Sequence, residues 1–115
     1  MAPSPNISTH VLDTDLGRPA RGVPVTLYRV NGTAATRVGA GVTDDDGRVR
    51  ALLDGALEAG AYRLEFDLAG YARSRGSHSG FFVAFATDFE IRDTNRSYHV
   101  PLIISPHSGM TYLGS

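Results

Sequence analysis

Short segments in which apolar and polar residues alternate, separated by glycine and proline, constrain the fold of this chain most. Residues 61–67 show the pattern most clearly, with Tyr62, Leu64 and Phe66 on one face and charged residues on the other. Alternation with a period of two is typical of a strand that covers a core with one face only. The chain is therefore expected to build sheets rather than a helical bundle.

Turn residues indicate how these strands connect. Residues 23–30 alternate in the same way and are followed by Asn31-Gly32, a pair that strongly favours a two-residue hairpin turn. A return strand is therefore predicted over residues 34–42. Several short strands with glycine and proline turns favour an all-β sandwich. Further strands are expected over residues 7–14, 83–91 and 98–105, with one short helix over 69–76.

Length and composition limit the possible functions. With 115 residues, we expect a single domain over residues 1–115 with one core. A net charge of −1 without a basic cluster gives no reason to expect nucleic acid or a membrane surface as a partner. The chain has no cysteine, which excludes disulfides, a thiolate nucleophile and cysteine-type zinc sites. The first residues do not resemble a secretory signal, so a cytoplasmic location is expected.

The segment from Tyr98 to Ser105 is unusual because both of its faces are largely uncharged. A small domain has too little chain to cover both faces of a sheet, so we expect a second subunit to cover one of them. That places His99 at or near an interface between subunits. Pro101 lacks a backbone donor, which predicts an edge strand or a bulged strand.

A second histidine lies in the first predicted strand. There Ser8, His10 and Leu12 share one face. A half-buried histidine bonded to a neighbouring backbone group is as good an interpretation of His10 as a functional one. Residue spacing alone does not join these distant segments into one site.

Other chemically suggestive residues have simpler interpretations. Asp44-Asp45-Asp46-Gly47 resembles part of a calcium loop, but Val42 and Leu53 occupy the first and last ligand positions, so a solvated turn is favoured. His78 lies in a serine- and glycine-rich loop and is assigned no role. His107 is expected at the surface. A zinc site built from His10, His99 and His107 in an assembled tetramer is a further alternative, but no spacing brings the three together, and no metal is expected.

Three separated blocks resemble 5-hydroxyisourate hydrolases, the transthyretin-like enzymes of purine breakdown. The blocks are STHVLDT at 8–14, TDDDGR at 43–48 and YHVPL at 98–102, and the chain ends in YLGS at 112–115. The resemblance implies an eight-stranded transthyretin-like (prealbumin-like) β-sandwich with one short helix. It also implies a homotetramer with active sites at subunit interfaces, the small molecule 5-hydroxyisourate as substrate, and no cofactor.

The resemblance also implies roles for individual residues. The catalytic set would be His10, Arg48, His99 and Ser115, with Arg48, Tyr112 and Ser115 contacting the substrate. Hydrolysis of a cyclic amide needs a base for the attacking water, and imidazole titrates near neutral pH, so His10 or His99 suits that role. Arg48 suits stabilisation of the developing oxyanion. Activity is expected to fall as the histidines protonate below about pH 6.5.

Leu113 departs from the resembled pattern, which has arginine there. The change removes a charge and up to five donors. A non-catalytic transthyretin-like protein that binds a small ligand is therefore the alternative function. It explains less, because a carrier does not need all four polar residues. A small adhesion or interaction module would explain the strands but neither histidine.

Overall fold

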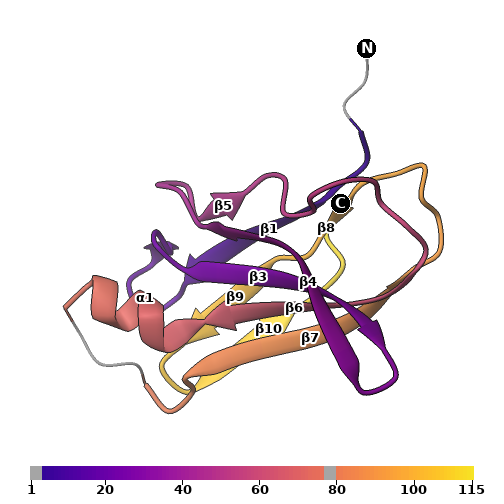
Figure 1. The fold of residues 1–115 in the computed structure, drawn as a ribbon. Helices are drawn as coiled ribbons and strands as arrows, with labels where there is room; N and C mark the ends of the chain where they lie inside the picture. The colour runs from indigo at the N-terminus through magenta and orange to yellow at the C-terminus, as the bar shows by residue number, and fades with distance from the viewer. Residues whose placement is uncertain (1–3, 77–79) are drawn as a thin grey trace.

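Two β-sheets pack face to face in the computed structural model, which describes residues 4–76 and 80–115 (Figure 1). One is an antiparallel four-stranded sheet in the order β4-β3-β6-β7. Its strands are β3 (Pro24–Asn31), β4 (Ala34–Val42), β6 (Gly60–Asp67) and β7 (Ala84–Ile91). The predicted hairpin between β3 and β4 is confirmed, with its two-residue turn at Gly32-Thr33, one residue later than Asn31-Gly32, and Gly32 has a positive φ of 60°.

The second sheet is organised around β1 (Ile7–Asp13). The other segments of this sheet are β2 (Arg18–Pro19), β5 (Arg48–Val49), β8 (Tyr98–His99), β9 (Leu102–Ser105) and β10 (Ser108–Thr111). β8 and β9 both run parallel to β1, as two halves of one strand interrupted at Val100-Pro101. If β8 and β9 count as one strand and the two-residue β2 as part of the turn after β1, the described residues form the expected eight strands.

Pro101 predicts either an edge strand or a bulged strand, and the edge alternative is wrong. β9 lies inside the sheet, between β1 and β10. Proline cannot donate a ladder hydrogen bond, and here the strand accommodates it by an interruption rather than by an edge position. The carbonyl of Pro101 instead accepts a hydrogen bond of 2.8 Å from the hydroxyl of Thr111.

The core lies between the two sheets and comes from the alternating faces predicted by the sequence. Tyr62, Leu64 and Phe66 point inward as expected. Val83, the first residue of the strand expected over 83–91, instead precedes β7 and is 61% exposed. His78, with its loop, lies outside the described residues. The largest fully buried apolar side chains are Ile7, Val11, Val23, Val25, Leu27, Leu52, Tyr62, Leu64, Phe66, Ile91 and Leu102.

The predicted helix is α1 (Leu68–Ser74), which directly follows β6. Asp67 caps its first turn, because its carboxylate accepts a hydrogen bond of 2.8 Å from the backbone N–H of Gly70. Within the described residues, no helix is long and apolar enough to cross a membrane.

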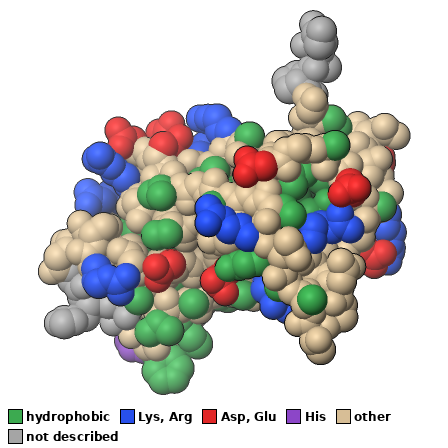
Figure 2. Space-filling view, viewed as in Figure 1, with side chains coloured by type: hydrophobic (Ala, Val, Ile, Leu, Met, Phe, Trp, Pro, Cys, Tyr) green, Lys and Arg blue, Asp and Glu red, His purple; other side chains and the backbone are tan. Residues whose placement is uncertain are grey.

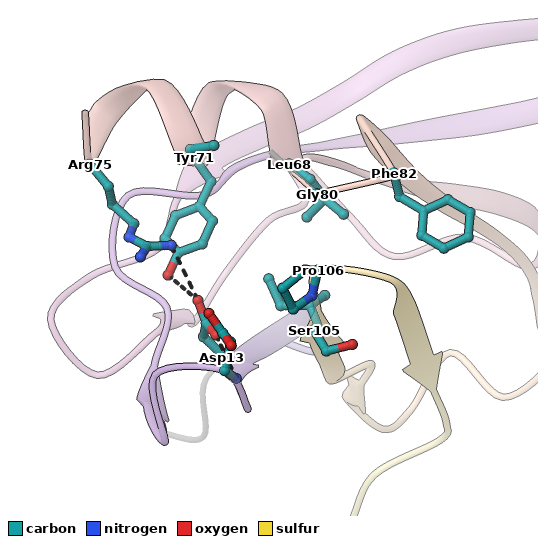
Figure 3. Close-up of a pocket in the computed structure, with 11 residues that line it drawn as sticks. Asp13, Leu68, Tyr71, Arg75, Gly80, Phe82, Ser105 and Pro106 are labelled. Carbon is teal, nitrogen blue, oxygen red and sulfur yellow. Dashed lines mark hydrogen bonds and ion pairs between the residues drawn. The ribbon is translucent and has the colours of Figure 1, made fainter. Parts of the chain in front are cut away.

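A buried carboxylate ties α1 to the end of β1 (Figure 3). Asp13 is only 4% exposed. One of its oxygens accepts hydrogen bonds from the backbone N–H groups of Asp15 and Leu16, and the other accepts from the Tyr71 hydroxyl at 2.7 Å and from Arg75 at 3.5 Å. Burial and the hydrogen bond to Asp13 raise the pKa of Tyr71 to about 12. Both oxygens of the carboxylate are thus occupied, and this cluster holds the helix in place.

We expect Tyr71→Phe to lower the free energy of unfolding by about 1–2 kcal/mol, because it removes one hydrogen bond to a buried charge while keeping the ring. Denaturant unfolding at matched protein concentration measures the change. Tyr28→Phe is the control, since the Tyr28 hydroxyl has no hydrogen bond within the part of the chain that the structure describes. Equal stability of the two variants would contradict this assignment.

Candidate functional site

The outer face of the β1 sheet carries most of the predicted site residues. Alternation along β1 turns Ile7, Thr9 and Val11 into the core, so Ser8 and His10 face outward. Ser8 lies opposite His99 in the parallel pair with β8, and His10 lies opposite Arg48 in the antiparallel pair with β5. Strand pairing therefore brings three segments that are distant in sequence onto one face.

His99 makes a direct side-chain contact with Ser8. Its Nδ1 atom lies 2.9 Å from the Ser8 hydroxyl oxygen. Burial lowers the pKa of His99, and the positive charges of Arg48 and His10 lower it further. Both effects favour the neutral imidazole, the form in which one ring nitrogen can accept a proton.

A tight turn positions Arg48 at the start of β5. The carboxylate of Asp44 accepts hydrogen bonds from the backbone N–H groups of Asp46 (2.9 Å) and Arg48 (3.0 Å). Gly47 has a φ of 75°, and a Cβ there would lie 2.5 Å from the carbonyl oxygen of Val11. The aspartate-rich motif is thus a turn, as predicted, and its glycine allows β5 to approach β1 closely.

The end of the chain folds back onto the same face. The backbone N–H of Gly114 donates a hydrogen bond of 2.8 Å to the carbonyl of His99. Ser115 therefore lies beside His99, and Figure 1 shows the C-terminus close to β8. A hollow of about 340 Å³ forms there, lined by Ser8, Arg48, Arg96, Tyr98, His99 and Ser115 among others.

Three of the four predicted catalytic residues, Arg48, His99 and Ser115, line this hollow, and His10 lies next to it on β1. Tyr112 does not line it. Its side chain, with that of Leu113, lines a separate hollow beside Thr87 and Phe89 of β7.

Five residues of the hollow are not among the site residues predicted from the sequence, and two of them, Ser8 and Arg96, bear on the chemistry; the five are Ser8, Arg96, Ser97, Tyr98 and Gly114. Ser8 was recognised only as a neighbour of His10 on the strand, and Arg96 lies in a loop without periodicity. The signal for Ser8 was its outward position in the block that contains His10. No sequence signal marked Arg96.

Two further predictions concern His107 and a metal site. His107 is exposed in the turn between β9 and β10, at the opposite end of this strand pair from His99. Among residues 4–76 and 80–115, no three histidine, cysteine, aspartate or glutamate side chains gather in a way that could hold a metal ion.

A different hollow, of about 200 Å³, lies between α1 and β9 (Figure 3). Leu68 and Phe82 provide apolar lining, and the polar groups are mainly the Asp13, Tyr71 and Arg75 cluster. These polar groups bind one another and hold α1 in place, so we assign them a structural role rather than a role in ligand binding. The outer face of the β1 sheet remains the candidate site.

The two-sheet arrangement is a transthyretin-like, or prealbumin-like, β-sandwich with a histidine and arginine cluster on one outer face. A family model described as HIUase/Transthyretin family matches residues 7–114. The chain belongs to this family.

Individual relatives agree with this result. The chain is 42% identical to the 5-hydroxyisourate hydrolase of Deinococcus radiodurans over 119 residues, with both chains fully covered. Its structure resembles that of Klebsiella pneumoniae 5-hydroxyisourate hydrolase, with a TM-score of 0.81, 34% identity, and coverage of 95% of this chain and 98% of the other. It also resembles sea bream transthyretin in complex with thyroxine, with a TM-score of 0.84, 29% identity, and coverage of 94% and 93%.

The electrostatics of the cluster predict how His99 titrates. In an NMR titration, we expect a His99 pKa below the ordinary value of about 6.5 and a higher pKa in Arg48→Gln, because removing the cation makes the imidazolium less unfavourable. Arg37→Gln, which removes an exposed arginine of β4, is the control and should leave the titration unchanged. A His99 pKa at or above 6.5, or one that does not respond to Arg48, would contradict the described geometry.

Proposed function

We propose that this chain hydrolyses 5-hydroxyisourate to 2-oxo-4-hydroxy-4-carboxy-5-ureidoimidazoline, as an enzyme of urate degradation. The observation that carries the proposal is the single hollow that His99, Arg48 and Ser115 line together in a member of this family. Relatives named 5-hydroxyisourate hydrolase, with which the chain aligns over its full length, support it.

His99 is the general base of the proposed mechanism. A neutral imidazole takes a proton from water as the water oxygen attacks the ring carbonyl carbon. The carbon–nitrogen bond of the cyclic amide then breaks, and the leaving nitrogen takes up a proton. We favour His99 over His10 because His99 lines the hollow, contacts Ser8 and has a lowered pKa.

Arg48 stabilises the negative charge that develops on the carbonyl oxygen during attack. Its planar guanidinium is suited to bind an oxyanion, and no carboxylate lies at ion-pair distance from it within the described part of the chain. The positive charge is therefore available to a ligand in the hollow.

Ser115 orients the substrate or His99 through its hydroxyl or its terminal carboxylate. We do not propose a covalent serine mechanism, which would need a base and an orienting acid in line with the hydroxyl. The hydroxyl that contacts His99 belongs to Ser8. Substrate contact by Tyr112 stays a prediction, since within one chain its side chain lines the neighbouring hollow.

The enzyme explains the site better than the carrier does. A carrier of an apolar ligand needs a hollow that is largely apolar, whereas this one is lined by two arginines, a histidine and serines. Leu113, the residue that suggested a carrier, lies beside β7 and outside this hollow.

We further propose that the chain acts as a homotetramer. β7 and β10 each form the free edge of a sheet, and unpaired edges favour pairing with another copy. Apolar side chains accumulate near these edges, with Phe81 75%, Leu113 64% and Met110 55% exposed. Figure 2 shows hydrophobic side chains gathered at one lower edge, while basic and acidic residues are mixed over the middle of the face. A cytoplasmic location is part of the same proposal.

Activity is tested by generating 5-hydroxyisourate with a urate oxidase and following the decay of its absorbance. We expect untagged protein to accelerate the decay. His99→Ala is expected to lower kcat by about 100-fold or more, the usual scale of general-base loss. His107→Ala should retain full rate, since His107 is exposed at the other end of the strand pair. Unaccelerated decay with folded protein would refute the hydrolase.

Assembly is tested by native mass spectrometry. We expect a mass four times the 12.3 kDa of one chain. Met110→Asp should shift the population to smaller species, because it places a charge beside the free edge formed by β10. A monomeric wild-type protein at micromolar concentration would refute the tetramer.

A further inference from the structure

A second arginine besides Arg48 lines the hollow. Arg96 comes from the loop between β7 and β8 and lines the same hollow as His99 and Ser115. None of the chemistry proposed above uses it.

Aromatic stacking and backbone hydrogen bonds hold Arg96 in a defined position. Its guanidinium carbon lies 4.5 Å from the centre of the Tyr98 ring, and its Nε donates a hydrogen bond of 3.2 Å to the carbonyl of Ser97. The ring is itself anchored, because the Tyr98 hydroxyl donates a hydrogen bond of 2.7 Å to the carbonyl of Asp93. The backbone N–H of Tyr98 also donates a hydrogen bond of 2.9 Å to the carbonyl of Asn6.

The charge of Arg96 is not neutralised by a neighbour. Within residues 4–76 and 80–115, neither Arg96 nor Arg48 has a carboxylate at ion-pair distance, whereas Arg92 in the same loop pairs with Glu90 at 3.3 Å. Two unpaired cations that line one hollow favour an anionic ligand, and Arg is suited to bind carboxylate or enolate oxygens through two donors at once.

We propose that Arg96 is a second anion-binding residue of this site, which binds negatively charged oxygen on the ring and the carboxylate that ring opening creates. The inference rests on the proposed function for the identity of that carboxylate. Hydrolysis forms a bond between the water oxygen and the carbonyl carbon and breaks the bond from that carbon to nitrogen. Ionisation of the resulting acid adds a negative charge to the ligand while it is still bound. Arg48 thus acts on the transition state, and Arg96 on the bound substrate and product.

Arg96→Gln tests the proposal against the matched control Arg92→Gln, which removes a charge from the same loop outside the hollow. Urate, a stable purine anion, serves as the binding probe in calorimetry, and steady-state kinetics use 5-hydroxyisourate. We expect Arg96→Gln to raise both the Kd of urate and the KM by about 5- to 20-fold, with kcat within about twofold of wild type, the scale of one charge-assisted contact. Arg96→Lys should recover part of the affinity, and Arg92→Gln should match wild type.

Binding and turnover separate the two proposals. Weakened urate binding in Arg96→Gln alone supports the role of Arg96 even if wild-type protein does not hydrolyse 5-hydroxyisourate, in which case only the proposed function fails. Equal urate affinity for the Arg96→Gln and Arg92→Gln proteins, or no urate binding by wild type, would overturn the role of Arg96. A fall in kcat at unchanged KM would also overturn it, because the residue would then act on the transition state.

Discussion

The pairing of β1 with its neighbours is the interaction on which the rest of the site depends. β1 takes β8 and β9 along one edge in parallel and β5 along the other in antiparallel orientation. Because side chains alternate along a strand, this register turns Ser8 and His10 outward together with their partners His99 and Arg48. A shift of one residue in β1 would bury the polar side chains and expose the core residues Ile7 and Val11.

Two arginines of the site, Arg48 and Arg96, have no carboxylate at ion-pair distance within the described residues. Most arginines elsewhere in the described residues pair with acids, as Arg63 does with Asp88 at 2.7 Å. Within the described part of the chain, the one carboxylate that lines the hollow is that of the chain end at Ser115, and burial together with Arg48 and His10 favours the neutral imidazole of His99. The same arrangement keeps a base available and attracts an anion, which are the two requirements of the proposed reaction.

Local patterns in the sequence predicted most of the fold but only part of the site. The hairpin between β3 and β4 and the inward faces of β3 and β6 follow from neighbouring residues, so they could be read directly. The contact between Ser8 and His99 spans 91 positions and depends on a register that no local pattern specifies. Pro101 misled the edge assignment because an interruption serves an inner strand equally well, and Arg96 was missed because its loop has no periodicity.

In the proposed mechanism His99 is the general base, and the cluster around it sets its pKa. The most direct test is the pH dependence of kcat/KM, which reports the ionisation of the free enzyme. With His99 as the base, we expect an acid limb that lies below pH 6.5 and coincides with the His99 titration, and that moves to higher pH in Arg48→Gln together with that titration. A limb that does not follow the His99 pKa, or a rate that stays constant throughout the protonation of His99, would contradict the account.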